Sequence, residues 1–193
     1  MSSTSSSILS RYGQPLELTF ELPDIDFPPV SERAHGEVCM AILRPSGRLL
    51  LQTKENYPGS VMRLPSGGIH RGESADDALL REVWEETNLT VKVERFVARI
   101  GYRAGEQRSR FCTNLFLVRE VSGELQSNDP DEKISDWREA LPGELPAYAE
   151  KLRGMTPSWR SWGIFRAAAI DILLAHTVDI LEDAAGGNPR QVG

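Results

Sequence analysis

The chain of 193 residues contains few of the side chains that bind zinc or form disulfides, with two cysteines and three histidines. Cys39 and Cys112 are far apart in sequence, and the histidines do not follow the spacing of zinc ligands, so we expect neither a disulfide scaffold nor a zinc site. A reducing, cytoplasmic location is therefore expected. The sequence also lacks an apolar run of roughly 18 residues, which a membrane helix needs, so no membrane partner is expected.

Positive charge is also scarce. The chain has 22 Lys and Arg residues against 28 Asp and Glu, a net charge of −6. Broad, non-specific binding to nucleic acid needs a basic surface, so we do not expect nucleic acid to be the main partner. A small anionic substrate is not excluded, because a local basic patch or a bound metal ion can outweigh the total charge.

The length of the chain suits one domain with a hydrophobic core. Its Ser-rich start, MSSTSSSILS, has neither the basic beginning nor the apolar segment of a signal peptide. We expect a single domain over 14–185, with flexible tails at 1–13 and 186–193.

Strands and helices are predicted without a regular alternation of one strand and one helix. This order argues against a doubly wound parallel sheet and favours an α/β fold with a mixed sheet packed between helices. The hydrophobic periodicity predicts strands at 16–22, 123–126 and 133–139, hairpins over 36–54 and around 104–107, and helices near 75–87, 145–153 and 158–183.

The helix near 75–87 has clear signals at both ends. Ser74 is a favoured N-cap, and Asn88 follows the helix where a left-handed residue is needed. Apolar residues at helical spacing should face the core: Ala75, Leu79 and Val83, with Leu80 and Trp84 as a second line.

The same helix carries Glu82, Glu85 and Glu86 in its C-terminal half, where the helix dipole disfavours negative charge. Like charges at this spacing repel by about 0.2–0.5 kcal/mol per pair. A solvated face is one explanation, since Arg81 can pair with Glu85. The glycine-rich loop before the helix, GGIHRGE, supports another, because glycines allow close approach to a ligand. A divalent cation such as Mg²⁺ would turn the repulsion into binding energy.

The stretch from Gly67 to Leu89 resembles the Nudix box of the Nudix hydrolases. The family pattern is a Gly, five residues, a Glu, seven residues, and then Arg-Glu-aliphatic-any-Glu-Glu-any-Gly-aliphatic. The one departure is Asn88 in place of the last Gly, and Asn tolerates the same backbone geometry. The matching positions are Gly67, Glu73, Arg81, Glu82, Val83, Glu85, Glu86 and Leu89.

This resemblance implies an α/β/α sandwich and hydrolysis of a diphosphate linkage in a nucleoside diphosphate derivative. It implies that Gly67, Glu82, Glu85 and Glu86 bind Mg²⁺ or Mn²⁺ and that Arg81 orients a box glutamate. Glu73 would support the loop or a further metal ion. The proton acceptor would be Glu82 or Glu85, or an acid on a later loop, for which Glu132 is the candidate.

Several residues outside the box are candidate substrate contacts. Arginine suits phosphate recognition because its guanidinium carries a planar fork of donors, and tyrosine can stack on a base. Each of these residues could equally be a solvated or packing residue. The candidates are Arg63, Arg99, Arg103, Arg110 and Tyr57.

Two other functions remain open. One is a Nudix-fold nucleotide-binding or regulatory module without catalysis, although such modules usually lose box acids that this chain keeps. The other is processing of RNA 5′ ends, against which the acidic balance argues. The long helix near 158–183 has an aromatic start and leaves room for a homodimer contact. The sequence does not identify the substrate.

Overall fold

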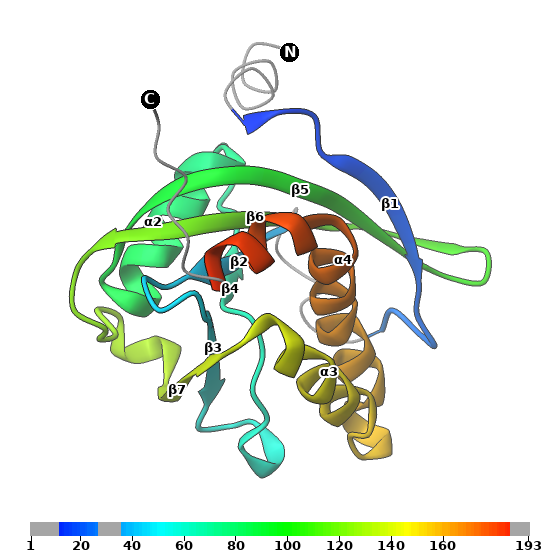
Figure 1. The fold of residues 1–193 in the computed structure, drawn as a ribbon. Helices are drawn as coiled ribbons and strands as arrows, with labels where there is room; N and C mark the ends of the chain where they lie inside the picture. The colour runs from blue at the N-terminus through cyan, green and yellow to red at the C-terminus, as the bar shows by residue number, and fades with distance from the viewer. Residues whose placement is uncertain (1–11, 27–35, 186–193) are drawn as a thin grey trace.

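A mixed β-sheet lies at the centre of the computed structural model, which describes residues 12–26 and 36–185 (Figure 1). In this part of the chain the sheet has seven strands, in the order β1-β5-β6-β2-β3-β7, with β4 paired to β2. The β1/β5 and β2/β6 pairs are parallel, and the other pairs are antiparallel, which confirms the predicted mixed sheet. The strands are β1 (Leu16–Glu21), β2 (Glu37–Leu43), β3 (Leu49–Lys54), β4 (Ser66–Gly68), β5 (Thr90–Ala104), β6 (Gln107–Ser122) and β7 (Ile134–Ala140).

Helices cover both faces of the sheet. The helix α2 (Ala75–Thr87) packs on one face, while α3 (Leu145–Arg153) and α4 (Arg160–Ala185) pack on the other (Figure 1). Short 3₁₀ turns are η1 (Pro58–Ser60), η2 (Pro130–Glu132), η3 (Pro142–Glu144) and η4 (Pro157–Trp159). Among the described residues, no helix combines the length and the apolar character needed to cross a bilayer.

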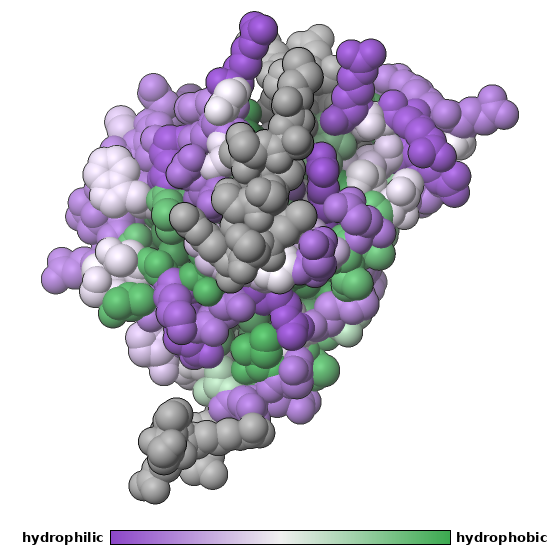
Figure 2. Space-filling view, turned by 90° about the horizontal axis from the view of Figure 1, so that it is seen from above, coloured by the Kyte–Doolittle hydropathy of each residue, from purple (hydrophilic) through white to green (hydrophobic). Residues whose placement is uncertain are grey.

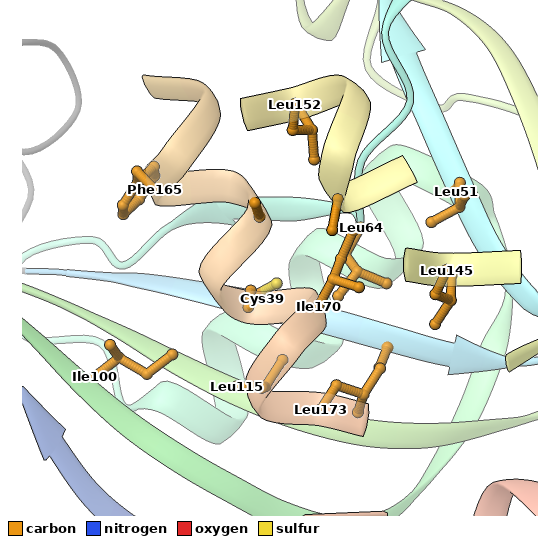
Figure 3. Packing of buried hydrophobic residues seen from close by; sticks show 14 of the residues in the cluster. Cys39, Leu51, Leu64, Ile100, Leu115, Leu145, Leu152, Phe165, Ile170 and Leu173 are labelled. Carbon is orange, nitrogen blue, oxygen red and sulfur yellow. The ribbon is translucent and has the colours of Figure 1, made fainter. Parts of the chain in front are cut away.

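The strand β2 is buried along its whole length and divides its side chains between two cores. Successive strand residues point to opposite faces, so every second residue faces α2 and the others face α3 and α4. Figure 3 shows the second core, where Cys39 and Leu115 of the sheet lie beneath Phe165 and Ile170 of α4. The β2 residues facing α2 are Val38, Met40 and Ile42, and those facing α3 and α4 are Cys39, Ala41 and Leu43.

The predicted caps of α2 are confirmed. The Ser74 hydroxyl accepts a hydrogen bond from the Asp77 amide, and Asn88 adopts the left-handed conformation with φ 56°. The second apolar line is wrong, because Leu80 and Trp84 are 49% and 56% exposed. These two side chains lie on the outer face of the helix, and one stripe of apolar residues is enough to dock α2 on the sheet.

The strand predicted at 123–126 is also wrong. This segment runs past the C-terminal end of α2, where the Gln126 amide donates to the Thr87 carbonyl and the Asn128 amide donates to the Glu85 carbonyl. The end of this segment and the residues that follow it thus bond free helix carbonyls and not another strand. The tails predicted at 1–13 and 186–193 lie, except for residues 12 and 13, outside the described residues.

Candidate active site

The glycine-rich loop brings its backbone directly against an acid of α2. Gly67 lies in β4 opposite Val38 of β2. A Cβ atom at Gly67 would lie 1.8 Å from the Glu82 Cδ atom, so no side chain fits at this position while Glu82 keeps its place. Only glycine allows this contact between the β4 backbone and the Glu82 carboxylate.

Arg81 holds three carboxylates at once. Its guanidinium donates to both carboxylate oxygens of Glu73, to Glu82 and to Glu85, each at 2.8 Å. A further donation reaches the Gly68 carbonyl at 2.9 Å. The planar fork of donors in arginine makes such multiple pairing possible. Arg81 therefore ties the acidic face of α2 to the loop that precedes it.

A second cation lies at the other end of the acidic stripe. Lys54, the last residue of β3, places its Nζ atom 3.2 Å from the Glu86 Oε1 atom. The same ammonium group hydrogen-bonds the carboxylate of Glu132, which belongs to η2. The structure thus brings the acid predicted on the later loop to the box acids, through a lysine that the sequence analysis did not single out.

Burial and hydrogen bonding act in opposite directions on the acids that Arg81 holds. Burial raises the pKa of Glu82 to about 7, an effect that the hydrogen bond from Arg81 only partly offsets. The hydrogen bonds from Arg81 lower the pKa of Glu73 to about 2. Two acids on one guanidinium therefore differ in proton affinity because one is buried and the other is more accessible.

The acids beside Lys54 also differ. Burial raises the pKa of Glu86, although the charges of Arg63 and Lys54 act against it. Burial also disfavours the charged form of Glu132, but the hydrogen bond and charge of Lys54 outweigh it and keep the pKa of Glu132 below its usual range. Glu132 therefore stays ionised at neutral pH next to a fully buried acid.

This set of groups suits a hard divalent cation. Both carboxylate oxygens of Glu86 are buried, with the Lys54 ammonium as their direct charged neighbour, and oxygen atoms are the ligands that Mg²⁺ prefers. Among the residues that the structure describes, no three acidic, histidine or cysteine side chains already converge as a metal-binding group. The acids are instead paired with two cations, Glu73, Glu82 and Glu85 with Arg81, and Glu86 and Glu132 with Lys54. The groups that could hold an ion are the carboxylates of Glu82, Glu85, Glu86 and Glu132 and the backbone of Gly67.

Two of the predicted substrate residues lie beside this cluster but have other partners. Arg63 is 1% exposed, and its guanidinium donates to the Tyr57 hydroxyl at 3.0 Å, to the Leu64 carbonyl and to the Ser66 hydroxyl. The Tyr57 ring packs against Trp162 with centroids 4.8 Å apart. Both side chains therefore support the loop that leads into β4.

The other three arginines lie on the long β5–β6 hairpin. Arg99 shares a row across the sheet with Gly67, through Asn114 and Val38, at three strand spacings or about 14 Å. Arg103 pairs with Glu21 of β1 at 2.7 Å. Arg110 is exposed on β6, close to the hairpin turn. The structure does not gather these three side chains at the acidic cluster.

Sequence reasoning missed two pairs of charged residues. No motif includes Lys54, and its position beside Glu86 depends on how β3 packs against α2. The other pair is buried, with Arg166 of α4 donating to both carboxylate oxygens of Glu37 at 2.9 Å. Arg166 was detectable in principle, because it is the single charge in the apolar run from 162 to 170.

A hollow beside α3 is not part of this cluster. It has a volume of about 480 Å³ and lies between the loop 58–62 and α3, on the face of the sheet away from α2. Its lining, which includes Met62, Arg138, Tyr148 and Met155, has no acid. We assign the candidate site to the acidic cluster, because its carboxylates can bind a divalent cation and the lining of this hollow offers none.

Solved structures resemble this fold. A NUDIX hydrolase from Nitrosomonas europaea aligns with a TM-score of 0.51 and 21% identity, over 77% of this chain and 95% of that one. The MutT NUDIX hydrolase from Burkholderia pseudomallei aligns with a TM-score of 0.50 and 21% identity, over 74% and 99% of the two chains. At this level of identity the likeness shows the fold alone.

Curated relatives cover shorter stretches. NAD-capped RNA hydrolase NudC of Photorhabdus laumondii is 32% identical over 113 residues, 55% of this chain and 41% of the relative. ADP-ribose pyrophosphatase of Methanocaldococcus jannaschii is 28% identical over 89 residues, 46% of this chain and 53% of the relative. The chain therefore spans about half the length of these two curated relatives.

The family model described as the NUDIX domain matches residues 33–158, which is 126 of the 193 residues. The matched region contains the loop, α2 and the cluster of acids around Arg81 and Lys54. The chain belongs to the Nudix hydrolase family.

Proposed function

We propose that the protein is a metal-dependent pyrophosphohydrolase that cleaves a diphosphate linkage in a nucleoside diphosphate derivative. The observation that carries this proposal is the cluster of Glu82, Glu85, Glu86 and Glu132, in which the carboxylate of Glu86 is fully buried and contacted by the ammonium of Lys54. A buried carboxylate is costly unless a cation accompanies it, and the one ammonium of Lys54 is shared between Glu86 and Glu132. A bound divalent cation would stabilise these carboxylates in place.

The chain's own residues would then have separate tasks. Glu82, Glu85 and Glu86 would hold Mg²⁺ or Mn²⁺ together with the Gly67 backbone. Bound there, such an ion neutralises the diphosphate and helps to activate the attacking water. Arg81 would keep the carboxylates in place through its hydrogen bonds.

The proton acceptor would be Glu82, Glu85 or Glu132. The raised pKa of Glu82, about 7, matches what a general base needs near neutral pH. Glu132 is ionised, and the Lys54 ammonium contacts both Glu132 and Glu86. Glu132 would therefore accept a proton or complete the set of metal ligands. Single replacement of each acid by Gln separates these roles.

The substrate class is supported by the names of the relatives, which include an ADP-ribose pyrophosphatase and RNA pyrophosphohydrolases. We infer that this chain acts on a small nucleotide derivative, because its net charge is −6. Arg99, Arg103 and Arg110 would meet the distal parts of such a substrate. Arg63 and Tyr57 would contribute to substrate binding by holding the loop beside the acids in place. We also infer a cytoplasmic location from the scarcity of cysteine.

The test is a panel of candidate substrates in ¹⁸O-labelled water with Mg²⁺, read by mass. The panel contains nucleoside triphosphates, nucleotide sugars, ADP-ribose, dinucleotides, dinucleoside polyphosphates and a 5′-triphosphate RNA. Chelator-sensitive cleavage at a diphosphate, with ¹⁸O on one phosphate product, is the expected result.

Other outcomes have distinct meanings. Preference for the RNA would select the 5′-end-processing function over small nucleotides. Binding of a ligand without cleavage would select the regulatory module. Cleavage that continues in excess chelator would contradict the metal-dependent mechanism. Light scattering at high protein concentration tests the homodimer through α4, and a mass of one chain would rule it out.

A further inference from the structure

Lys54 belongs to the acidic cluster but, like Glu132, lies outside the Nudix box. It ends β3, and its side chain is 15% exposed. Its ammonium group contacts two carboxylates from different elements, Glu86 of α2 at 3.2 Å and Glu132 of η2. The three residues are 32 and 46 positions apart along the chain, so the contact exists only in the folded protein.

The buried acid needs this contact. Glu86 has no exposed surface, and its direct contact with a donor is the ammonium of Lys54, 3.2 Å from its Oε1 atom. Removing the partner of a buried charge is strongly destabilising, because the remaining charge has neither water nor a counter-ion. The ammonium of Lys54 is the positive group that touches Glu86 directly, while Arg63 is engaged by Tyr57 and Ser66.

The position of Lys54 is also where a metal ion would be most useful. A cation that binds both Glu86 and Glu132 would lie between α2 and η2. Lys54 already contacts both of these carboxylates at that position. An ammonium group and a divalent ion cannot occupy the same space, and at close range they repel each other.

We propose that Lys54 is a tethered cation that fills the space between Glu86 and Glu132 in the metal-free protein and that a divalent ion must displace it. This inference rests on the proposed metal-dependent function. Lys54 would stabilise the empty site and weaken its affinity for metal. It is thus a positioning residue that sets how much Mg²⁺ or Mn²⁺ the protein needs.

The test measures Mn²⁺ binding directly, by the electron paramagnetic resonance signal of the free ion, without substrate. Lys54→Met and Lys54→Gln should bind Mn²⁺ about tenfold more tightly than the wild type, because a like charge has been removed from the site. Lys54→Arg keeps the charge and should bind like the wild type. Lys92→Met changes the net charge equally, on the exposed surface of β5 beside Glu94 and outside the acidic cluster, and should have no effect.

Unfolding measurements give a second readout. Without metal, Lys54→Met should melt at a lower temperature than the wild type, and Mn²⁺ should raise its melting temperature by more. If Lys54→Met folds only when Mn²⁺ is present, this rescue by the ion is an expected result. The Mn²⁺ affinity is then measured on Lys54→Gln.

The failures are distinguishable. Equal Mn²⁺ affinity in the wild type, Lys54→Met and Lys54→Gln would overturn the role of Lys54 and leave the metal-dependent function standing. Weaker binding in the two variants would also overturn it, since Lys54 would then support the metal site. No saturable Mn²⁺ binding by any of the proteins would overturn both proposals.

Discussion

Gly67 is the residue at which the site tolerates the least change. A Cβ atom would fall 1.8 Å from the Glu82 Cδ atom, so Gly67→Ala must move the carboxylate or the β4 backbone. We expect a loss of about 1–3 kcal/mol in the free energy of unfolding and of about 100-fold in turnover, because small misplacements of catalytic groups are costly. Chemical denaturation and initial rates measure the two effects.

Gly143→Ala is the matched control, since no atom lies within 4 Å of a Cβ at that position. It should leave both the free energy of unfolding and the turnover close to those of the wild type. Wild-type turnover in Gly67→Ala would show that the contact between Gly67 and Glu82 does not matter for the chemistry.

Asn88 replaces the last glycine of the box and adds contacts that glycine cannot make. Its side chain accepts from the Asn128 Nδ2 atom at 2.9 Å and donates to the Glu124 carbonyl at 3.1 Å. Asn88→Gly should therefore lower the free energy of unfolding by about 1 kcal/mol. Asn88→Ala should cost more, because alanine disfavours the left-handed conformation by a further 1–2 kcal/mol, roughly.

Urea denaturation of the two Asn88 variants decides this point. If Asn88→Gly is as stable as the wild type, the bridge from Asn88 to the segment 124–128 contributes nothing. In that event asparagine serves only as a substitute for glycine.

Glu82 makes stability depend on pH in a defined window. Its pKa is about 7 in the folded protein, above the ordinary value of 4.5, so between these pH values the folded state holds a proton that the unfolded state has released. Stability must then fall as the pH rises from about 4.5 to about 7. Glu86, whose pKa burial also raises, acts in the same direction, whereas Glu73 and Glu132, whose pKa values are lowered, are ionised in both states over most of this window.

The measurement is the melting temperature in chelator at pH 5.5 and pH 7.5. We expect a lower value at pH 7.5 in the wild type and a smaller difference in Glu82→Gln. A wild-type protein that is more stable at pH 7.5 would contradict the burial of Glu82 as the dominant effect.

Among the secondary-structure elements, the pair of α3 and α4 depends on one close approach. A Cβ atom at Gly163 would lie 2.0 Å from the Leu152 carbonyl oxygen. Gly163→Ala gains helix propensity of about 1 kcal/mol, but the clash must separate the helices, and overpacking costs about 1–3 kcal/mol. We expect a net loss in the free energy of unfolding with unchanged turnover per folded molecule, since the acids lie on the other face of the sheet.

Thermal unfolding and initial rates of Gly163→Ala test this separation of roles. Greater stability than the wild type would show that α3 and α4 adjust without cost. Lost turnover in a fully folded variant would show that the two faces of the sheet are coupled.

Elements with local signals could be predicted from the sequence. The helix α2 has Ser74 and Asn88 at its ends, and both signals depend only on neighbouring residues. The segment 123–126 could not be predicted, because its partners are carbonyls at the end of α2, 39 and 43 residues away for Gln126 and Asn128.

The same distinction applies to the candidate site. The spacing of Glu82, Glu85 and Glu86 on one helix is written in the sequence, and so is Arg81 within reach of them. The position of Lys54 could not be predicted from the sequence, because it depends on how β3, α2 and η2 pack together. The long-range contacts of a single side chain have no local signal.

At the scale of the whole molecule, the two cores on opposite faces of the sheet differ in size and in their distance from the acids. The core against α3 and α4 is the larger, and the acids lie at the edge of the smaller core, under α2. Figure 2 shows a mainly hydrophilic surface on one face, with small separated apolar patches.

The central claim is that the acids of α2 carry out metal-dependent hydrolysis. The most direct measurement compares turnover of the best panel substrate by the wild type, Glu85→Gln and Glu106→Gln, with Mg²⁺ and with chelator. We predict that Glu85→Gln lowers turnover about 100-fold or more while its melting temperature stays near that of the wild type. Glu106, exposed in the β5–β6 turn, is the control and should be replaceable without loss. Wild-type turnover by Glu85→Gln, or by the wild type in chelator, would contradict the account.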